Sequence, residues 1–490
     1  MATTTTGPAP EPVELWSHGA GGPIGVASGP QGFVERVNPA RLDEVVGRVA
    51  TVDAGSTDAV VRAAHRAFGP WSARAPEDRA GLLLAAADRV AATAEELGPL
   101  LARELGKVVA DCRGEMGFAA AYLRHAVAAT AGVGAATEVD DDLGRLRVIR
   151  RPYGVCAAIV PWNAPLILSI LKVAPALATG NTVVLKPSAR TPLSALRFAE
   201  LIADELPAGV LNVLAGAGSS MGDMLVAHPK VRMVSITGDT VTGKHIAEVA
   251  AGTVKRLHLE LGGKAPVIVF DDADVDLAAE TLKMAGYWNA GQDCTAACRV
   301  IAGPKVYDQL LAELADQVKT IKWGNPADAD DLDMGSLIAK AQADKVEGMV
   351  NRALEAKAEL VLGGARPDRP GAYFEPTVIA NPDQRSEIVQ DEVFGPVVTV
   401  QRFSDEEQAV RWANDVKFGL ASSLFTGSIG RAMRVARRLE FGTVWINEHF
   451  TLASETPHGG VKESGWGKDG SKYALEDYTV VKHITINTGV

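Results

Sequence analysis

Hydrophobic positions change their spacing part-way along the chain. Between Thr57 and about Thr130, alanine and leucine recur every three or four residues among charged residues, for example from Arg79 to Leu101. This spacing predicts several packed helices. From Gly154 onward, short apolar runs alternate with longer helical patterns. Repeated strand–helix units of this kind predict a parallel, doubly wound α/β sheet.

The apolar runs divide into two series. The first predicts strands at 155–160, 182–185, 210–214 and 231–236, and helices at 166–178, at 191–205 and from 241. In the second of these helices, Thr191 is the predicted N-cap and Pro192 the first-turn residue. The second series follows Gly262 and predicts strands at 267–270, at 298–301 and near 397 and 444, with helices from 275 and 306. The chain should therefore contain two α/β domains.

The two ends of the chain and one internal segment have a different character. Residues 145–151 and 478–486 alternate like exposed strands, whose unpaired edges need a partner. The first residues are rich in Thr, Pro and Gly, which predicts disorder. They lack the basic start and the apolar segment of a secretory signal.

Composition narrows the class of protein. A length of 490 residues is enough for two or three domains with sizeable cores. The net charge of −11 argues against nucleic-acid or anionic-membrane partners, which need a basic surface, and the apolar stretches are too short to span a bilayer. The four cysteines show no disulfide framework and no zinc-type spacing with histidine, so no metal site is predicted. The expected location is the cytoplasm.

Two residues are candidates for covalent chemistry. Cys294 follows Gly291, which permits a tight turn that leaves the sulfur accessible. Glu260 begins Glu-Leu-Gly-Gly-Lys, a turn between two strands that can aim its side chain into a cleft. A thiolate is a strong nucleophile, and a carboxylate of raised pKa can act as a base. Taken singly, a cysteine is more often a small buried hydrophobe and a glutamate near a turn a solvated surface group.

Together, in this order and spacing, the two motifs resemble the aldehyde dehydrogenase superfamily. The resemblance continues, in the family's order, through five further blocks: Pro-Trp-Asn-Ala-Pro at 161–165, Leu-Lys-Pro-Ser at 185–188, Thr-Gly at 237–238, Glu-Val-Phe-Gly-Pro at 392–396 and Pro-His-Gly-Gly at 457–460. It implies an α/β fold with two doubly wound domains, one binding the cofactor and one catalytic, and a small β oligomerisation arm.

The resemblance also implies domain boundaries. These are a disordered N-terminus at 1–25, an NAD(P)-binding domain at 26–130 and 152–261, a catalytic domain at 262–463, and the arm at 131–151 and 464–490. An arm of this kind implies a homo-oligomer, either a dimer or a tetramer.

The implied activity is NAD(P)-dependent oxidation of an aldehyde to a carboxylic acid. In that chemistry the Cys294 thiolate attacks the aldehyde to form a thiohemiacetal. The Asn163 side chain and the Cys294 backbone N–H hold the oxyanion. Hydride passes to the nicotinamide, and Glu260 activates water to hydrolyse the resulting thioester. Lys172 tunes the thiol and Glu260 in some relatives, and Cys298 is structural, although it is close enough to Cys294 to invite an oxidative disulfide.

The cofactor site rests largely on the resemblance. A glycine-rich turn at 216–222 follows a strand and opens a helix, but its spacing is not GxGxxG, and a purely structural turn is an equal alternative. The family places the diphosphate near Gly238 and Gly243 instead. The expected cofactor-binding residues are Trp162, Lys186, Ser188, Ala189, Gly218, Gly222, Thr237, Gly238, Gly243, Leu261, Glu392 and Phe394.

Two positions depart from the family pattern. NAD-preferring relatives carry Glu where this chain has Ala189, and Arg190 follows. The missing carboxylate removes a repulsion against a 2′-phosphate and Arg190 can attract one, so NADP is expected beside NAD. Asp239 replaces the usual Ser and is not assigned to the diphosphate.

The substrate is expected to be an aminoaldehyde such as 4-aminobutanal. Segments 288–299, 449–460 and 467–481 are similar to 4-aminobutyraldehyde dehydrogenases. Trp288 can offer a cation–π face, and Asp293 and Glu115 can attract an ammonium group, although Glu115 also fits an ordinary surface position. The expected pocket residues are Glu115, Phe118, Leu171, Trp288, Asp293, Leu452 and His458. No arginine is evident for a carboxylate-bearing substrate.

Several alternatives stay open. Betaine aldehyde, succinate semialdehyde and broad aliphatic aldehydes are other substrates. A non-catalytic relative on the same fold should have lost Cys294, Glu260 or Asn163, and all three are present. A phosphorylating or CoA-acylating enzyme uses an acceptor other than water, against which the retained Glu260 argues.

Overall fold

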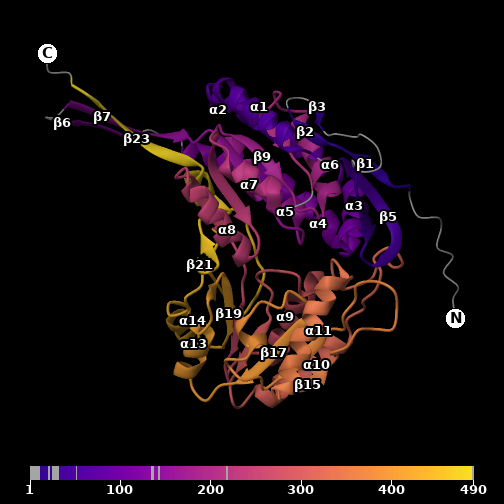
Figure 1. Ribbon diagram of the computed structural model, residues 1–490. Coiled ribbons are helices and arrows are strands. Elements are labelled where there is room, and N and C mark those ends of the chain that lie inside the picture. Colours follow the sequence, from indigo (N-terminus) through magenta and orange to yellow (C-terminus); the bar gives the residue numbers. More distant parts are fainter. Residues whose placement is uncertain are drawn as a thin grey trace.

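The computed structural model describes residues 11–19, 22–24, 33–50, 52–133, 137–141, 144–216 and 219–487. Two α/β bodies lie one above the other in Figure 1, and a narrow ribbon of strands projects from the upper body. The two largest clusters of buried apolar side chains are centred one in each body. The α/β class expected from the alternation of apolar runs is therefore confirmed.

The sheet of the upper body has eight strands in the order β22-β12-β11-β8-β9-β10-β2-β3. The five from β12 to β10 are parallel. Every residue of β8 is buried, as expected for a strand covered by helices on both faces. In the order of the sheet, the strands are Gly465–Trp466, Arg256–Glu260, Val231–Thr237, Val155–Ile159, Thr182–Lys186, Leu211–Val213, Ser17–Gly19 and Gly22–Ile24.

The direction of chain winding reverses between β8 and β11. From β8 the chain moves to β9 and β10 on one side, whereas β11 and β12 lie on the other side. Open parallel sheets bind ligands at the carboxyl ends of their strands at such a reversal. A site is therefore expected just after Ile159 and Thr237, the last residues of β8 and β11.

Helices cover both faces of this sheet. The predicted helical region between Thr57 and Thr130 is confirmed as α1 to α4. Among the helices of the described ranges, none combines the length and apolar character that a bilayer span requires. The helices of this body are α1 (Ala54–Ser72), α2 (Pro76–Ala91), α3 (Ala94–Leu105), α4 (Val109–Val133), α5 (Pro165–Ala178), α6 (Pro192–Ala203), α7 (Ser219–Ala227) and α8 (Thr240–Ala251).

Thr191 and Pro192 occupy the N-cap and the first turn of α6, as expected. The Thr191 side chain, however, makes no capping hydrogen bond. The buried carboxylate of Glu104 accepts instead from the backbone N–H groups of Leu193 and Ser194, at 2.6 and 3.0 Å. A carboxylate on α3 therefore stabilises the positive end of α6, which local sequence cannot reveal.

The lower body holds a seven-stranded sheet in the order β15-β16-β17-β14-β13-β19-β20, parallel except at β15. In that order its strands are Glu359–Leu362, Thr377–Ala380, Val397–Arg402, Arg299–Ala302, Pro266–Val269, Ala421–Phe425 and Thr443–Ile446. Its helices are α9 (Val275–Tyr287), α10 (Tyr307–Lys319), α11 (Lys340–Glu355), α12 (Glu387–Gln390), α13 (Glu406–Asn414) and α14 (Ile429–Ala436), and a 3₁₀ turn, η1, covers Trp288–Gly291. The second predicted α/β series is thus confirmed.

The projecting ribbon is an antiparallel sheet of β23 (Thr479–Ile486), β7 (Gly144–Pro152) and β6 (Thr137–Asp141). It confirms the two exposed strands expected from alternation, because β23 pairs with β7 along its whole length. The boundary expected for the arm at 464 is wrong. Strand β22 belongs to the eight-stranded sheet, and α15 (Ser471–Asp477) packs on α4.

The expectation of a disordered N-terminus at 1–25 is wrong for part of its length. Residues 1–10 lie outside the described residues, but three short strands follow them. Strand β1 (Val13–Leu15) pairs with β5 (Arg41–Ala50), which also pairs with β4 (Phe33–Asn38). Strands β2 and β3 complete the edge of the eight-stranded sheet. Pairing with strands distant in sequence orders this segment despite its composition.

Candidate active site

A cavity of about 640 Å³ opens at the winding reversal of the eight-stranded sheet. Its walls come from the segments after β8, β9, β11 and β12, and from the lower body. The expected residues that line it are Trp162, Asn163, Lys186, Ser188, Ala189, Gly222, Thr237, Gly238, Leu261, Cys294, Glu392 and Phe394. Residues from seven sequence blocks therefore meet in one space.

Cys294 lies just after a left-handed turn. Asn289, Ala290 and Gly291 have φ values of 51°, 55° and 67°. A Cβ atom on Gly291 would collide with the carbonyl of Gly395. The expected tight approach at Gly291 is confirmed, and it sets the direction in which the chain enters Cys294.

Glu260 ends β12 and is 3% exposed. The Gly-Gly turn after it carries the chain from the upper sheet to the lower one, and a Cβ atom on Gly263 would collide with the carbonyl of Cys294. Burial, reinforced by the charge of Asp469, raises the pKa of Glu260 to about 8. A carboxylate of this kind can accept a proton near neutral pH.

Asn163 follows β8 and is tied to the segment before Cys294. The Asn289 side chain donates to the Asn163 carbonyl at 2.9 Å. Asn163 and Cys294 line the same cavity, and Asn163 is 3% exposed. The thiol and the amide therefore share the cavity, and Glu260, which is not among the residues lining it, is close enough for its charge to act on Cys294.

Comparison with known proteins identifies the family. The model of the aldehyde dehydrogenase family matches residues 26–484. This chain belongs to the aldehyde dehydrogenase family. Betaine aldehyde dehydrogenase of Bacillus subtilis (strain 168) is 40% identical over 463 residues, covering 92% of this chain and 94% of that protein. The 3-sulfolactaldehyde dehydrogenase of Pseudomonas putida is 39% identical over 451 residues, covering 92% of each chain.

A solved structure shows the same fold. Betaine aldehyde dehydrogenase from Staphylococcus aureus in complex with NAD⁺ superposes with a TM-score of 0.93 at 38% identity, covering 97% of this chain and 95% of that one. The expected fold, enzyme class and nicotinamide cofactor are confirmed. These relatives are named for betaine aldehyde and sulfolactaldehyde, so specificity for aminoaldehydes stays a prediction.

The cavity of this aldehyde dehydrogenase fits a dinucleotide. The hydroxyl of Thr237 is buried without a hydrogen-bond partner and lines the cavity, so it can serve a bound group. A Cβ atom on Gly243 would collide with Leu261, which explains the close packing of α8 on this wall. Trp162 and Phe394, which both line the cavity, meet edge to face, with ring centroids 5.3 Å apart. Gly218 lies outside the described residues.

Two charged residues of the cavity are already partly engaged. One oxygen of Glu392 accepts from the Gly263 N–H at 2.9 Å, and burial raises the pKa of Glu392 to about 7. Asp239 caps α8, because its carboxylate accepts from the backbone and hydroxyl of Thr242, each at 2.8 Å. This capping explains why an acidic residue is stable where the family usually has Ser.

The thiol of Cys294 is held in its protonated form. Burial raises its pKa well above the usual value, and Asp293, Glu392 and Glu260 add to the effect. A thiol in these surroundings must lose its proton to become a nucleophile. Removing the charge of Glu260 should therefore favour the thiolate.

The expected substrate role of Glu115 is wrong. Glu115 is 1% exposed and pairs with the buried Lys107 at 2.9 Å. Its second oxygen accepts from the N–H groups of Leu166 and Ile167 at the start of α5. The open alternative, a surface position, is wrong as well. Glu115 is a buried structural carboxylate, because its bonds to Lys107 and to α5 leave it no free side.

The aromatic face expected to receive a cation already carries one. The ammonium group of Lys107 lies 3.9 Å from the ring centroid of Trp288. Asp111 of α4 lies near the Trp288 side chain, whose interaction with the carboxylate works against the rise in the pKa of Asp111 that burial causes. Sequence reasoning missed Lys107 and Asp111, since neither belongs to a motif and both act only through tertiary contact.

The other expected pocket residues lie in different surroundings, and none of them is among the residues that line the cavity. Asp293 turns one oxygen toward the N–H and hydroxyl of Thr295, at 2.7 and 2.6 Å. Leu171 is buried in the core of the upper body, and Phe118 stacks on Tyr122. The remaining two are Leu452, which is exposed, and His458, which is partly buried and whose backbone pairs with that of Asp469.

A histidine that sequence reasoning missed holds the segment after Cys294. Burial lowers the pKa of His449 to about 4, so the imidazole is neutral. Its Nε2 lies 2.7 Å from the Thr295 carbonyl, which can only accept, so Nε2 carries the proton and Nδ1 accepts from the Ser423 hydroxyl at 2.9 Å. His449 therefore fixes the backbone beside the nucleophile.

Proposed function

We propose that this aldehyde dehydrogenase oxidises aldehydes bearing an ammonium group, such as 4-aminobutanal, through a Cys294 thioester. Cys294 reacts as its thiolate and bonds to the aldehyde carbon, which forms a thiohemiacetal. The Asn163 amide and the Cys294 N–H stabilise the oxyanion. The nicotinamide of bound NAD(P) supplies the hydride acceptor. Glu260 then takes a proton from water, whose oxygen displaces the thiolate and releases the acid.

The position of the Asp111 carboxylate, near Trp288, favours a cationic substrate. Glu115 already forms an ion pair with Lys107. Asp111 is then the carboxylate near Trp288, one of the expected substrate residues, that is left to attract a cation. Burial raises the pKa of Asp111, so an incoming ammonium group would stabilise its ionised form. The arginines of α4, Arg113 and Arg124, pair with Glu95 and Asp88 and are exposed. The relative from Bacillus subtilis is named for betaine aldehyde, which is also cationic.

Asp111→Asn tests the substrate class. We expect kcat/KM for 4-aminobutanal to fall about tenfold, because an ion pair of roughly 1.4 kcal/mol is lost, while kcat/KM for hexanal is unchanged. The assay is NAD(P)H formation with 4-aminobutanal, 3-aminopropanal, betaine aldehyde, succinate semialdehyde and hexanal. Glu95→Gln, on an exposed carboxylate of α3, is the matched control. A wild-type preference for hexanal or succinate semialdehyde would contradict the proposal.

We also infer that NADP is accepted beside NAD. Ala189 and Arg190 line the cavity, and no carboxylate stands at either position to repel a 2′-phosphate. Arg190 is exposed, so its guanidinium is accessible to such a phosphate. Wild-type kcat/KM values for the two cofactors should be comparable. Arg190→Ala should lower kcat/KM about tenfold for NADP and little for NAD, and negligible NADP turnover in the wild-type enzyme would refute the inference.

We propose, finally, that the chain forms a dimer or tetramer through the arm. Three apolar side chains on β23, Val480, Val481 and Ile486, are exposed, as is Val148 on β7. Exposed apolar residues on a projecting sheet favour burial against another copy.

A further inference from the structure

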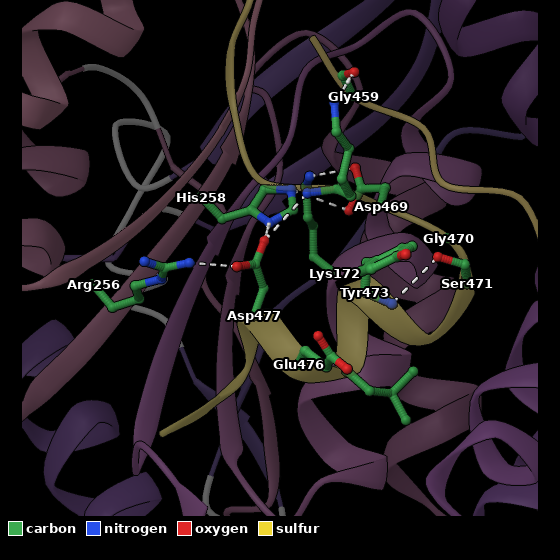
Figure 2. A network of polar contacts seen from close by, with 12 residues as sticks. Lys172, Arg256, His258, Gly459, Asp469, Gly470, Ser471, Tyr473, Glu476 and Asp477 are labelled. Carbon is green, nitrogen blue, oxygen red and sulfur yellow. Dashed lines mark hydrogen bonds and ion pairs between the residues drawn. The ribbon is translucent and has the colours of Figure 1, made fainter. Parts of the chain in front are cut away.

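A cluster of charged side chains gathers around His258, two residues before Glu260 (Figure 2). The ammonium group of Lys172, on α5, lies 2.6 Å from Oδ2 of Asp469. Both side chains are at most 1% exposed. The other oxygen of Asp469 lies 3.4 Å from Nε2 of His258, which is also fully buried.

His258 continues this cluster toward the surface. Its Nδ1 lies 3.1 Å from Oδ2 of Asp477, whose side chain is 14% exposed. Arg256 pairs with the other oxygen of Asp477 and is 43% exposed. Figure 2 shows the imidazole between the two carboxylates, with Arg256 on the far side of Asp477. His258 is thus hydrogen-bonded to Asp477 at Nδ1, and Nε2 lies within ion-pair distance of Asp469.

His258 and Glu260 lie on the same face of β12, because side chains two residues apart on a strand point to the same side. Glu260 has a buried oxygen without a hydrogen-bond partner. The charges of Lys172, His258 and Lys468 lower its pKa, against burial and Asp469, which raise it. The cluster therefore acts on the proposed base through space.

The surroundings of His258 favour its protonated, cationic form. Burial and the Lys172 charge lower its pKa, but Asp469 and Asp477 outweigh them, so the pKa of His258 is raised above its usual value. The same contacts, from Lys172 and His258, lower the pKa of Asp469 despite its burial. The remaining titratable groups around His258 and Asp469 are Tyr478, Tyr122, His458, Lys468 and Glu260.

A count of charges shows what His258 contributes. Lys172 and Asp469 cancel, and Arg256 and Asp477 cancel at the solvent side. A protonated His258 then adds a net positive charge two residues from Glu260 on the same strand, beside that of Lys468. We propose that His258, oriented by Asp477, is a positioning residue that stabilises the Glu260 carboxylate for hydrolysis of the thioester. The proposal rests on Glu260 being the hydrolytic base.

His258→Gln tests this role. Glutamine is uncharged but retains hydrogen-bonding groups, so the pKa of Glu260 should rise by about one unit. With a pKa near 8, about one tenth of Glu260 is ionised at pH 7, and with a pKa near 9 about one hundredth. We expect the acidic limb of kcat against pH to move up by about one unit, with about a tenfold loss at pH 7 that is recovered above pH 9.

A second variant and a control separate this role from a structural one. Asp477→Asn should move the limb in the same direction, and the double variant should move it no further than His258→Gln alone. His65→Gln, on the exposed face of α1, should leave the profile unchanged. The first burst of NAD(P)H should keep its amplitude in every variant, because it precedes hydrolysis.

Two results would overturn the proposal. One is an unshifted limb in both His258→Gln and Asp477→Asn, and the other is an equal loss of kcat at every pH. Should His258→Gln not fold, Asp477→Asn decides alone, since that side chain reaches the surface. Glu260→Gln distinguishes a failure of the role of Glu260 from a failure of the role of His258. If this variant still hydrolyses the thioester, Glu260 is not the hydrolytic base. If it stalls while the limb of His258→Gln is unshifted, only the role of His258 fails.

Discussion

Cys294→Ser should abolish aldehyde oxidation while the protein stays folded. A serine hydroxyl is nearly the same size but ionises far above neutral pH, so it is a poor nucleophile unless a strong base activates it. Glu260, with a pKa of about 8, is too weak a base to ionise an alcohol. We expect kcat to fall by about 10⁴-fold or more. The measurements are NAD(P)H formation, the thermal unfolding midpoint and the affinity for NAD.

Cys298→Ser is the matched control for this change. Cys298 is also half-buried, and the residues after it form β14 of the lower sheet. The substitution should leave kcat within about twofold of the wild-type value. It replaces one sulfur atom with oxygen at a partly exposed side chain, and such changes rarely disturb packing. Substantial activity in Cys294→Ser, or a complete loss in Cys298→Ser, would refute the assignment of the nucleophile.

Local pattern predicted the elements but not their partners. The run of five buried residues at β8 and the helix that follows it can be read from hydrophobic spacing. That β11 lies beside β8 while β10 is two strands away on the other side cannot, because strand order depends on contacts distant in sequence. The cavity exists only through that order. Its position was therefore implied by the family resemblance rather than by periodicity.

The substrate residues show the same limit. A charged residue such as Glu115 in a helix is usually at the surface, yet Glu115 is buried against Lys107 and the start of α5. Trp288 was correctly recognised as a surface for a cation, but the cation is Lys107. A buried ion pair needs both partners to be known, and a sequence pattern shows each partner alone.

His258 was within reach of sequence reasoning. In Arg256–Glu260 polar residues alternate with leucine, which places His258 on the same face of a strand as Glu260. What the alternation does not show is that Asp469 and Asp477 return to this face from the end of the chain. Those contacts depend on β22 and α15 packing against the upper body.

Glu260→Gln should convert the enzyme into one that acts once and then stops. Glutamine has the shape of glutamate without a basic oxygen, so it cannot take a proton from water. The first half of the reaction should survive, because the charge of Glu260 is one of the causes that raise the pKa of Cys294. Removing that charge lowers the pKa of the thiol and increases its thiolate fraction.

The expected record is a burst of about one NAD(P)H per active site, followed by turnover about 10³-fold slower than in the wild-type enzyme. Intact-mass measurement during the slow phase should find the acyl group on Cys294, and Glu440→Gln, an exposed glutamate, should behave as wild type. In the wild-type enzyme kcat should rise about tenfold per pH unit below 8 and level off above, since Glu260 works only when ionised. Neither burst nor acyl-enzyme in Glu260→Gln would mean that Glu260 is needed before the thioester forms. Its carboxylate would then be the base that ionises Cys294, and another group would have to activate water.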